Sequence, residues 1–140
     1  MGWELTSNVM VQRRILIVDD EPSICEGVSA ILIREGYDVR QAASGEEAVK
    51  LSCEEEFDLI LMDLIMPGID GADACARIRE HRPDARVVAI SGSPVGQRME
   101  KFVRSGGVEL FLYKPFGKRE LISGIEKALA ARPGPHPRQA

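Results

Sequence analysis

Residues 59–71, LILMDLIMPGIDG, show most directly how this chain of 140 residues folds. They begin with four apolar residues and reach one acid, Asp63, after which Pro67 and Gly68 indicate a turn. A run this short and this apolar is typical of a buried strand. Strands that are buried on both faces occur in parallel sheets covered by helices. The stretch therefore predicts a central parallel strand with a carboxylate near its carboxyl end.

Further strand-like and helix-like segments alternate on either side of this stretch. The other expected strands are residues 15–18, 37–42, 87–90 and 109–113. A segment with apolar residues at helical spacing follows each strand, although residues 91–107 are rich in glycine and predict a short or mobile helix. Five such units imply an α/β fold, with a parallel sheet, helices on both of its faces and right-handed crossovers.

Size and composition predict one soluble domain. The chain is 44% hydrophobic and 29% charged, which is ordinary for a globular protein with one core. We expect the domain at residues 14–131, an N-terminal extension at 1–13, and a Pro-rich tail or linker start at 132–140. The sequence shows neither a secretory signal nor an apolar run of roughly 18 residues, so we expect no contact with a membrane.

Cysteines and charges indicate the compartment and the kind of partner. Cys25, Cys53 and Cys75 lack CxxC spacing and are odd in number, so we expect reduced thiols and a cytoplasmic location. Residues 1–80 carry 17 acids and 7 Lys or Arg, whereas residues 81–140 carry 5 acids and 11 Lys or Arg. The basic half lacks the interleaved aromatic residues of a nucleic-acid binder, so we expect no direct binding to nucleic acid.

The chemistry is expected at the strand ends, because open α/β sheets bind ligands outside the carboxyl ends of their strands. Carboxylates gathered there repel one another unless a cation lies between them. Oxygen ligands with few carboxylates suit Mg²⁺, which keeps some of its waters and often pairs with phosphate. The strand-end residues are Asp19, Asp20 and Glu21 after the first strand, Asp63 after the third, Ser91 and Gly92 after the fourth, and Lys114 and Pro115 after the fifth.

The reaction that suits these groups is in-line phosphoryl transfer to the carboxylate of Asp63. Mg²⁺ and the ammonium of Lys114 would neutralise the developing charge, and Ser91 could donate a hydrogen bond to a phosphoryl oxygen. Single residues also have structural explanations, since Asp20 or Asp70 could simply cap the following helix. The occurrence of all these groups at strand ends of one chain favours the chemical interpretation.

Four motifs together resemble the receiver domains of two-component response regulators, over about residues 14–131: ILIVDDE, LILMDLIMPGIDG, VVAISG and FLYKPF. The resemblance implies a flavodoxin-like, doubly wound (βα)5 fold with strand order 2-1-3-4-5. It also implies a histidine kinase or histidine phosphotransfer protein as phosphodonor, and a downstream effector as partner. A domain of this kind is not an enzyme, beyond assisting its own phosphorylation and dephosphorylation.

The resemblance assigns the metal ligands. The aspartate that matches Asp63 is phosphorylated in the family and also binds Mg²⁺. The residue that matches Asp20 binds the metal directly, and the one that matches Asp19 supports it through water. The third protein ligand matches the backbone carbonyl of Ile65, two positions after the phosphorylated residue.

The resemblance also assigns phosphoryl-binding and switch residues. Ser91, the amide of Gly92 and Lys114 match groups that hold phosphoryl oxygens, and the Lys114–Pro115 bond matches one that is usually cis. Phe111 matches an aromatic residue that turns inward when the hydroxyl of Ser91 moves, the alternative being an ordinary core residue. The turn would reshape the surface of the domain's fourth helix, fifth strand and fifth helix.

That surface is a predicted docking face for an acidic partner or for a second copy of the chain, the alternative being an ordinary solvated surface. Its basic residues are Arg98, Lys101, Arg104, Lys118, Arg119 and Lys127.

The sequence also bears on two alternative functions and on the rate of self-dephosphorylation. A phosphohydrolase-like enzyme usually needs a second acid close after its nucleophile, and Leu64 and Ile65 follow Asp63 here. A pseudo-receiver interaction module would be indicated by loss of the acids or of Lys114, and all are present. Ile65 and Ser93 occupy positions that tune hydrolysis in the family, and they predict slow self-dephosphorylation.

Overall fold

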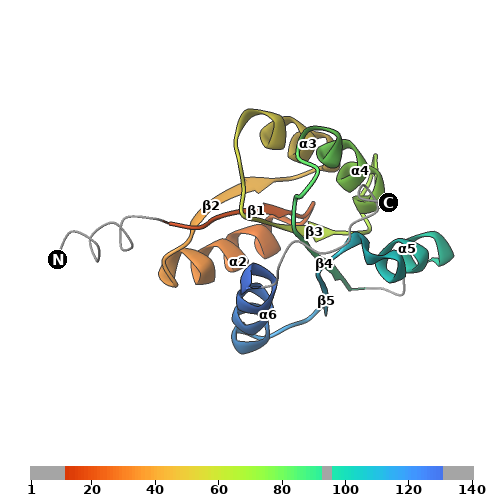
Figure 1. Ribbon diagram of the computed structural model, residues 1–140. Helices are drawn as coiled ribbons and strands as arrows, with labels where there is room; N and C mark the ends of the chain where they lie inside the picture. Colours follow the sequence, from red (N-terminus) through yellow and green to blue (C-terminus); the bar gives the residue numbers. More distant parts are fainter. Residues whose placement is uncertain (1–11, 93–95, 131–140) are drawn as a thin grey trace.

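The computed structural model describes residues 12–92 and 96–130, in which strands and helices alternate (Figure 1). Most of the expected N-terminal extension and the whole expected tail lie outside these residues, so the domain boundaries stay predictions. The elements are β1 (Arg14–Val18), α2 (Pro22–Arg34), β2 (Asp38–Ala42), α3 (Gly45–Glu54), β3 (Leu59–Asp63), α4 (Gly71–His81), β4 (Val87–Ser91), α5 (Gln97–Phe102), the π-helix η1 (Val103–Gly107), β5 (Leu110–Tyr113) and α6 (Lys118–Ala130).

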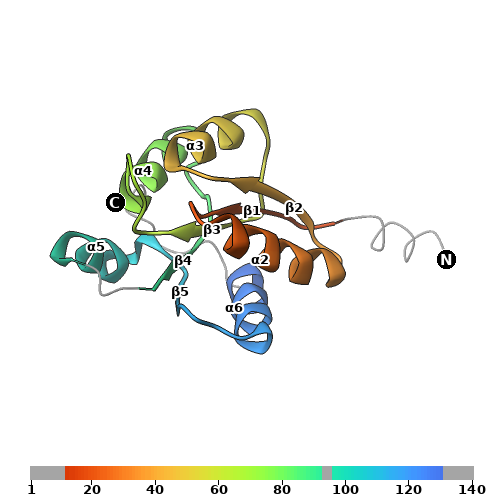
Figure 2. The ribbon, with the colours of Figure 1, turned by 180° about the vertical axis from the view of Figure 1, so that it is seen from behind.

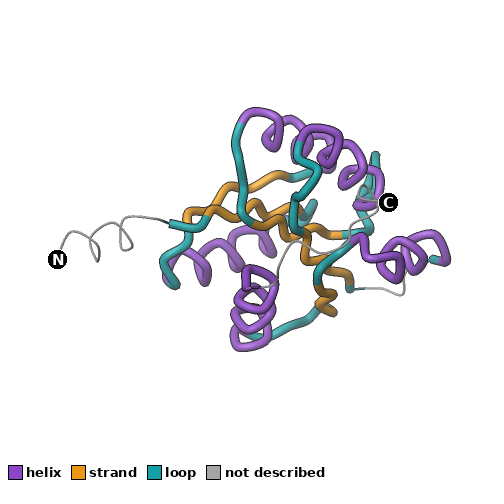
Figure 3. The backbone as a smooth tube through the Cα atoms, viewed as in Figure 1, coloured by secondary structure: helices purple, strands orange, loops and turns teal. Residues whose placement is uncertain are grey.

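The strands form one parallel sheet in the order β2-β1-β3-β4-β5. The α/β class and the flavodoxin-like strand order predicted above are therefore confirmed. β3 lies in the centre, with Ile15 of β1 opposite Leu59 on one side and Val87 of β4 opposite Ile60 on the other. Because all five strands run the same way, their carboxyl ends meet along one edge of the sheet. Figure 3 shows the strands in orange between the purple helices. Asp63 is consequently placed in the middle of that edge.

Helices cover both faces of the sheet, which explains the apolar strands. α2 and α6 lie on one face, and α3 and α4 on the other (Figures 1 and 2). Successive residues of β1 serve the two layers in turn: Ile15 and Ile17 pack with α2 and α6, whereas Leu16 and Val18 pack with α3 and α4. Each such side chain, when fully buried, stabilises the fold by about 1.5–3 kcal/mol. No helix in the described part of the chain is long and apolar enough to cross a membrane.

The turn after β3 is held by a close approach of two backbones. The amide of Gly71 donates to the carbonyl of Leu64 at 3.0 Å. A Cβ at Gly71 would lie 2.8 Å from the Cα of Leu64, so only glycine fits here. Asp70 caps α4, since its Oδ1 accepts from the amide of Asp73 at 2.9 Å. The segment between Asp63 and α4 is thus fixed at both ends.

The expected short helix between β4 and β5 is observed as α5. It has six residues and continues into the π-helix η1, which contains Gly106 at φ 87°. A Cβ at Gly107 would lie 2.4 Å from the ring of Phe102, so the ring packs directly on the glycine backbone. Met99 is the buried residue that α5 contributes to the core on the α3 and α4 side. This helix therefore has a small apolar contact with the body of the domain.

The two ends of α6 lie at opposite edges of the sheet. The helix begins at Lys118, four residues after Lys114, whose ammonium lies 3.4 Å from Oδ2 of Asp63. Near its end, the carbonyl of Leu129 accepts from the guanidinium of Arg86 at 2.7 Å. Arg86 directly precedes β4, so this hydrogen bond fastens the end of α6 to the amino edge of the sheet.

Candidate functional site

A shallow pocket of about 400 Å³ lies at the carboxyl edge of the sheet. Loops after four strands contribute to it, which is the arrangement expected of parallel strands that end together. The structure thus brings together strand-end residues that are far apart in the sequence. The pocket is lined by Asp20, Glu21, Asp63, Ile65, Ser91, Gly92 and Lys114.

Three carboxylates form the acidic part of the site. Oxygens of Asp19, Asp20 and Asp63 all lie within 4.8 Å of one another. Asp19 and Asp63 are buried, whereas Asp20 is exposed at the rim. The Oδ1 atoms of the two buried aspartates each accept from the amide two residues further on: Glu21 at 2.9 Å and Ile65 at 3.1 Å. These bonds orient both Oδ2 atoms away from their own loops.

Lys114 supplies the positive charge opposite these acids. Its Nζ lies 2.7 Å from Oδ2 of Asp19, 3.0 Å from Oε1 of Glu21 and 3.4 Å from Oδ2 of Asp63. The lysine donates hydrogen bonds to Glu21 and Asp63. Its shortest contact, with Oδ2 of Asp19, is an ion pair. One ammonium therefore serves three carboxylates.

The protonation of this group depends on burial. Burial is the main cause that raises the pKa of Asp63 to about 6, and the charge of Asp19 adds to it. The Ile65 amide and Lys114 act in the opposite direction without cancelling the effect. For Lys114, burial lowers the pKa, but the ion pairs with Asp19, Glu21 and Asp63 outweigh it and raise the pKa overall. In the metal-free site, burial therefore disfavours the ionised form of Asp63, whereas the neighbouring carboxylates favour the charged form of Lys114.

The acid cluster fits a hard divalent cation. Oδ2 of Asp19 is buried, its described partner is the ammonium of Lys114, and the carboxylate lies beside those of Asp20 and Asp63. Three carboxylates share one ammonium among the described residues of the pocket, so negative charge is in excess there. Oxygen-only ligands with this charge are those that Mg²⁺ prefers. The site is therefore chemically suited to magnesium.

The remaining predicted residues lie on the far side of Asp63. Ser91 ends β4 and is buried, and its carbonyl accepts from the amide of Lys114 at 2.8 Å. A Cβ at Gly92 would lie 3.3 Å from Cβ of Lys114, so a larger residue would crowd the lysine. The Lys114–Pro115 peptide bond is cis. Ser93, one of the two positions expected to tune hydrolysis, lies outside the described residues.

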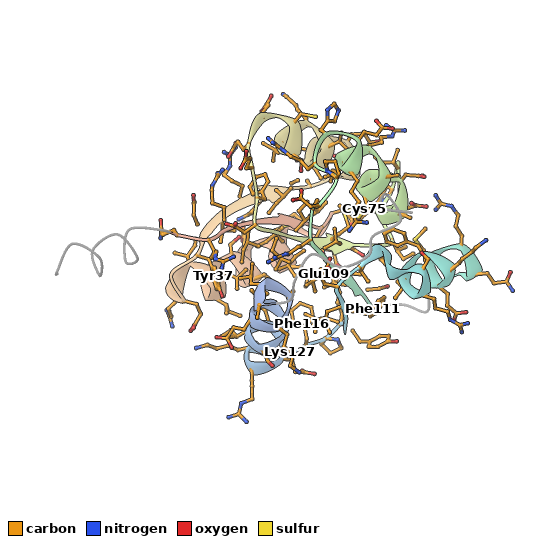
Figure 4. All side chains as sticks on the ribbon, viewed as in Figure 1. Tyr37, Cys75, Glu109, Phe111, Phe116 and Lys127 are labelled. Carbon is orange, nitrogen blue, oxygen red and sulfur yellow. The ribbon has the colours of Figure 1, made fainter. Side chains whose placement is uncertain are left out.

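Phe111 lies on β5 (Figure 4). It is half-buried and packs against the core on the α3 and α4 side, and its ring centroid is 4.6 Å from that of Tyr113. Tyr113 is 74% exposed, so the pair spans the distance from core to surface. The structure accommodates both explanations of Phe111, as a core residue and as a switch, and its role stays a prediction.

Two results concern the acids after β1. The suggestion that Asp20 caps α2 is wrong, because the N-cap is Glu21 and no side chain there accepts a capping hydrogen bond. The sequence placed Glu21 at the strand end without giving it a role, and the structure brings its carboxylate to Lys114. The sequence feature that could have indicated this contact is the position of Glu21 directly after Asp19 and Asp20, at the same sheet edge as Lys114.

A doubly wound parallel sheet with acids, a hydroxyl and a lysine at its carboxyl edge defines an α/β domain that can handle phosphoryl groups. Residues 15–126 match the family model of the response regulator receiver domain, so the chain belongs to this family. The predicted resemblance is thereby confirmed, and with it the function as a phosphoacceptor domain of two-component signalling. The competing prediction of a phosphohydrolase-like enzyme has no support from this assignment.

Known proteins of this family resemble the chain over most of its length. Transcriptional regulatory protein ResD of Bacillus subtilis is 36% identical over 121 residues, which are 86% of this chain and 49% of ResD. The chain thus spans about half the length of such curated relatives.

Solved structures agree with this assignment. A CheY-like receiver domain protein from Methanospirillum hungatei superposes with a TM-score of 0.80 at 29% identity, covering 85% of this chain and 94% of that one. The receiver domain of sensor histidine kinase PA1611 from Pseudomonas aeruginosa, with magnesium coordinated in its active-site cleft, has a TM-score of 0.77 at 28% identity, covering 86% and 100%.

Proposed function

We propose that Asp63 accepts the phosphoryl group, from a histidine kinase or a histidine phosphotransfer protein. The observation that supports this most is the position of its carboxylate, which is buried in the centre of the acid cluster and 3.4 Å from the ammonium of Lys114. Oδ1 is held by the Ile65 amide, which leaves Oδ2 to attack phosphorus. The new bond joins this oxygen to phosphorus, while the bond from phosphorus to the donor nitrogen breaks.

In this proposal the other residues stabilise the transferred group. Asp20, Asp63 and the carbonyl of Ile65 would hold Mg²⁺, with Asp19 in support through water. The metal, when bound, neutralises charge on the carboxylates and on the phosphoryl oxygens. Ser91, the Gly92 amide and Lys114 are suited to hold the phosphoryl oxygens, because they line the pocket beside Asp63.

We further propose that phosphorylation changes the surface formed by α5, η1, β5 and α6, called here the output face. β5 is an edge strand, so this face is open to partners. Movement of Ser91 toward the phosphoryl group would let Phe111 turn inward and so change the packing of α5. The partner is an effector or a second copy of the chain. The domain acts in the cytoplasm. It catalyses no reaction beyond its own phosphorylation and slow self-dephosphorylation.

Intact-mass analysis after incubation with acetyl phosphate tests the phosphoacceptor. We expect one phosphoryl adduct with Mg²⁺, little without it, and none in Asp63→Asn, because Mg²⁺ and a carboxylate nucleophile are both required. Decay of the adduct after removal of acetyl phosphate measures self-dephosphorylation. An adduct of equal yield in the Asp63→Asn variant would show that another residue is the acceptor.

Charge reversal tests the output face. Lys101 and Arg104 are exposed on α5 and η1, and Arg104 pairs with Glu100 one turn away, at 3.3 Å. We expect Lys101→Glu with Arg104→Glu to weaken self-association of the phosphorylated protein by about ten-fold, since charge pairs at interfaces contribute one to several kcal/mol. Sedimentation velocity measures this, and Lys50→Glu on α3 serves as the control. Equal dissociation constants for all three proteins would contradict a role of these residues in pairing.

A further inference from the structure

The ammonium of Lys114 is surrounded by carboxylates in the metal-free site. An ammonium has three N–H groups, and three carboxylates lie around this one at 2.7, 3.0 and 3.4 Å. Two of them, Asp19 and Asp63, are buried and belong to the acid cluster. The third, Glu21, is outside that cluster, and its side chain is 58% exposed. A phosphoryl oxygen therefore has to compete with these carboxylates for the ammonium of Lys114.

The three carboxylates differ in what a metal and a phosphoryl group would do to them. Those of Asp19 and Asp63 lie where Mg²⁺ is expected, and the metal would take over part of their charge. Glu21 is the N-cap residue of α2, but its side chain makes no capping hydrogen bond. Its carboxylate instead accepts from Lys114 at 3.0 Å. Glu21 is thus the carboxylate that keeps its full attraction for Lys114 when the site is loaded.

We propose that Glu21 is a positioning residue: its carboxylate binds the ammonium of Lys114 and so competes with the phosphoryl group for it. This inference rests on the proposed function of Asp63. The attraction of Glu21 for Lys114 would raise the free energy of the phosphorylated state relative to that of the unphosphorylated state. Glu21 would thereby set how readily the domain is switched on, without contacting the phosphoryl group itself.

The variant Glu21→Gln removes the charge and retains the size of the side chain. The probe is beryllofluoride, a mimic of the phosphoryl group on a carboxylate, titrated at saturating Mg²⁺ and followed by fluorine NMR. We expect Glu21→Gln to bind it about three- to ten-fold more tightly, the effect of releasing one hydrogen bond of typical strength, since Glu21 is largely exposed. Mg²⁺ alone should bind slightly more weakly, because one negative charge near the metal is lost. A variant that merely disturbs the fold would weaken both.

Two controls separate positioning from general charge effects. Glu26→Gln removes an exposed carboxylate from the same helix and should leave beryllofluoride binding unchanged. In a Lys114→Met background, Glu21→Gln should have less than about a two-fold effect, because the residue through which it acts is gone. The proposal is overturned if Glu21→Gln binds no more tightly than Glu26→Gln, or if its effect persists without Lys114. Failure of the wild-type protein to bind beryllofluoride with Mg²⁺ would instead overturn the proposed role of Asp63.

Discussion

Lys114→Met lowers the free energy of unfolding of the metal-free protein by about 3–5 kcal/mol at neutral pH, the range found when one partner of a buried ion pair is removed. The reason is the environment of the acids that remain. Asp19 is 1% exposed and Asp63 is 4% exposed, and Lys114 is the cation that the structure places between them. Methionine retains the length of the side chain but leaves two buried carboxylates close together without a counter-charge.

Urea unfolding in the presence of EDTA measures this loss. The loss should shrink toward pH 5, because the carboxylates can then take up protons and no longer need a counter-charge. Added Mg²⁺ should restore part of the stability, because it replaces the missing positive charge. Lys118→Met is the matched control, since Lys118 is an exposed lysine at the start of α6. A loss below about 1 kcal/mol, similar to that of an exposed ion pair, would show that the acids are solvated or protonated.

Asp63→Asn is expected to change stability in the opposite direction. Burial raises the pKa of Asp63 from its ordinary value of 3.8 to about 6 in the folded protein. Between these values the folded state binds more protons than the unfolded state, so stability falls as pH rises through this window. The loss above pH 6 amounts to roughly 2–3 kcal/mol, at 1.36 kcal/mol for each unit of pKa. Asparagine carries no charge and avoids this loss.

The metal-free Asp63→Asn variant should therefore be more stable than the wild type at pH 7.5, by about 1–3 kcal/mol after allowance for the lost attraction to Lys114. Below pH 4 the two proteins should converge, because Asp63 is then protonated in both states. Urea unfolding across pH 4–8 in EDTA measures the difference, and Asp84→Asn, at an exposed acid before β4, is the control. A variant that is less stable at pH 7.5, or a difference that does not vary with pH, would contradict this account of the site.

The fold and the membership of the site were predictable because the strands carry a simple signal. β1, β3 and β4 are short apolar runs that end in a polar residue or, for β1, directly before one, and the parallel arrangement brings those ends to one edge. The same reasoning could not place side chains within the site. It did not predict that Glu21 points to Lys114, because the torsions of a single exposed side chain leave no periodic pattern in a sequence.

α4 shows a second limit. At helical spacing Cys75 and Ala76 fall on one stripe of this helix, but Ala74 is fully buried and Ala76 is exposed. Small residues occur at most positions of this helix, so the apolar pattern hardly distinguishes one face from another. The contact with the sheet, through residues such as Ile78, decides which alanine faces inward. The π-helix after α5 is likewise a product of tertiary packing around Phe102 and Gly107.

The attachment of α6 at the amino edge of the sheet bears on how a signal would leave the domain. The helix has 13 residues and is therefore about 20 Å long at 1.5 Å for each residue. The last described residue, Ala130, therefore lies on the side of the sheet anchored by Arg86, opposite the edge where Asp63 lies. A change at Asp63 would reach that end of α6 through a movement of the helix as a whole.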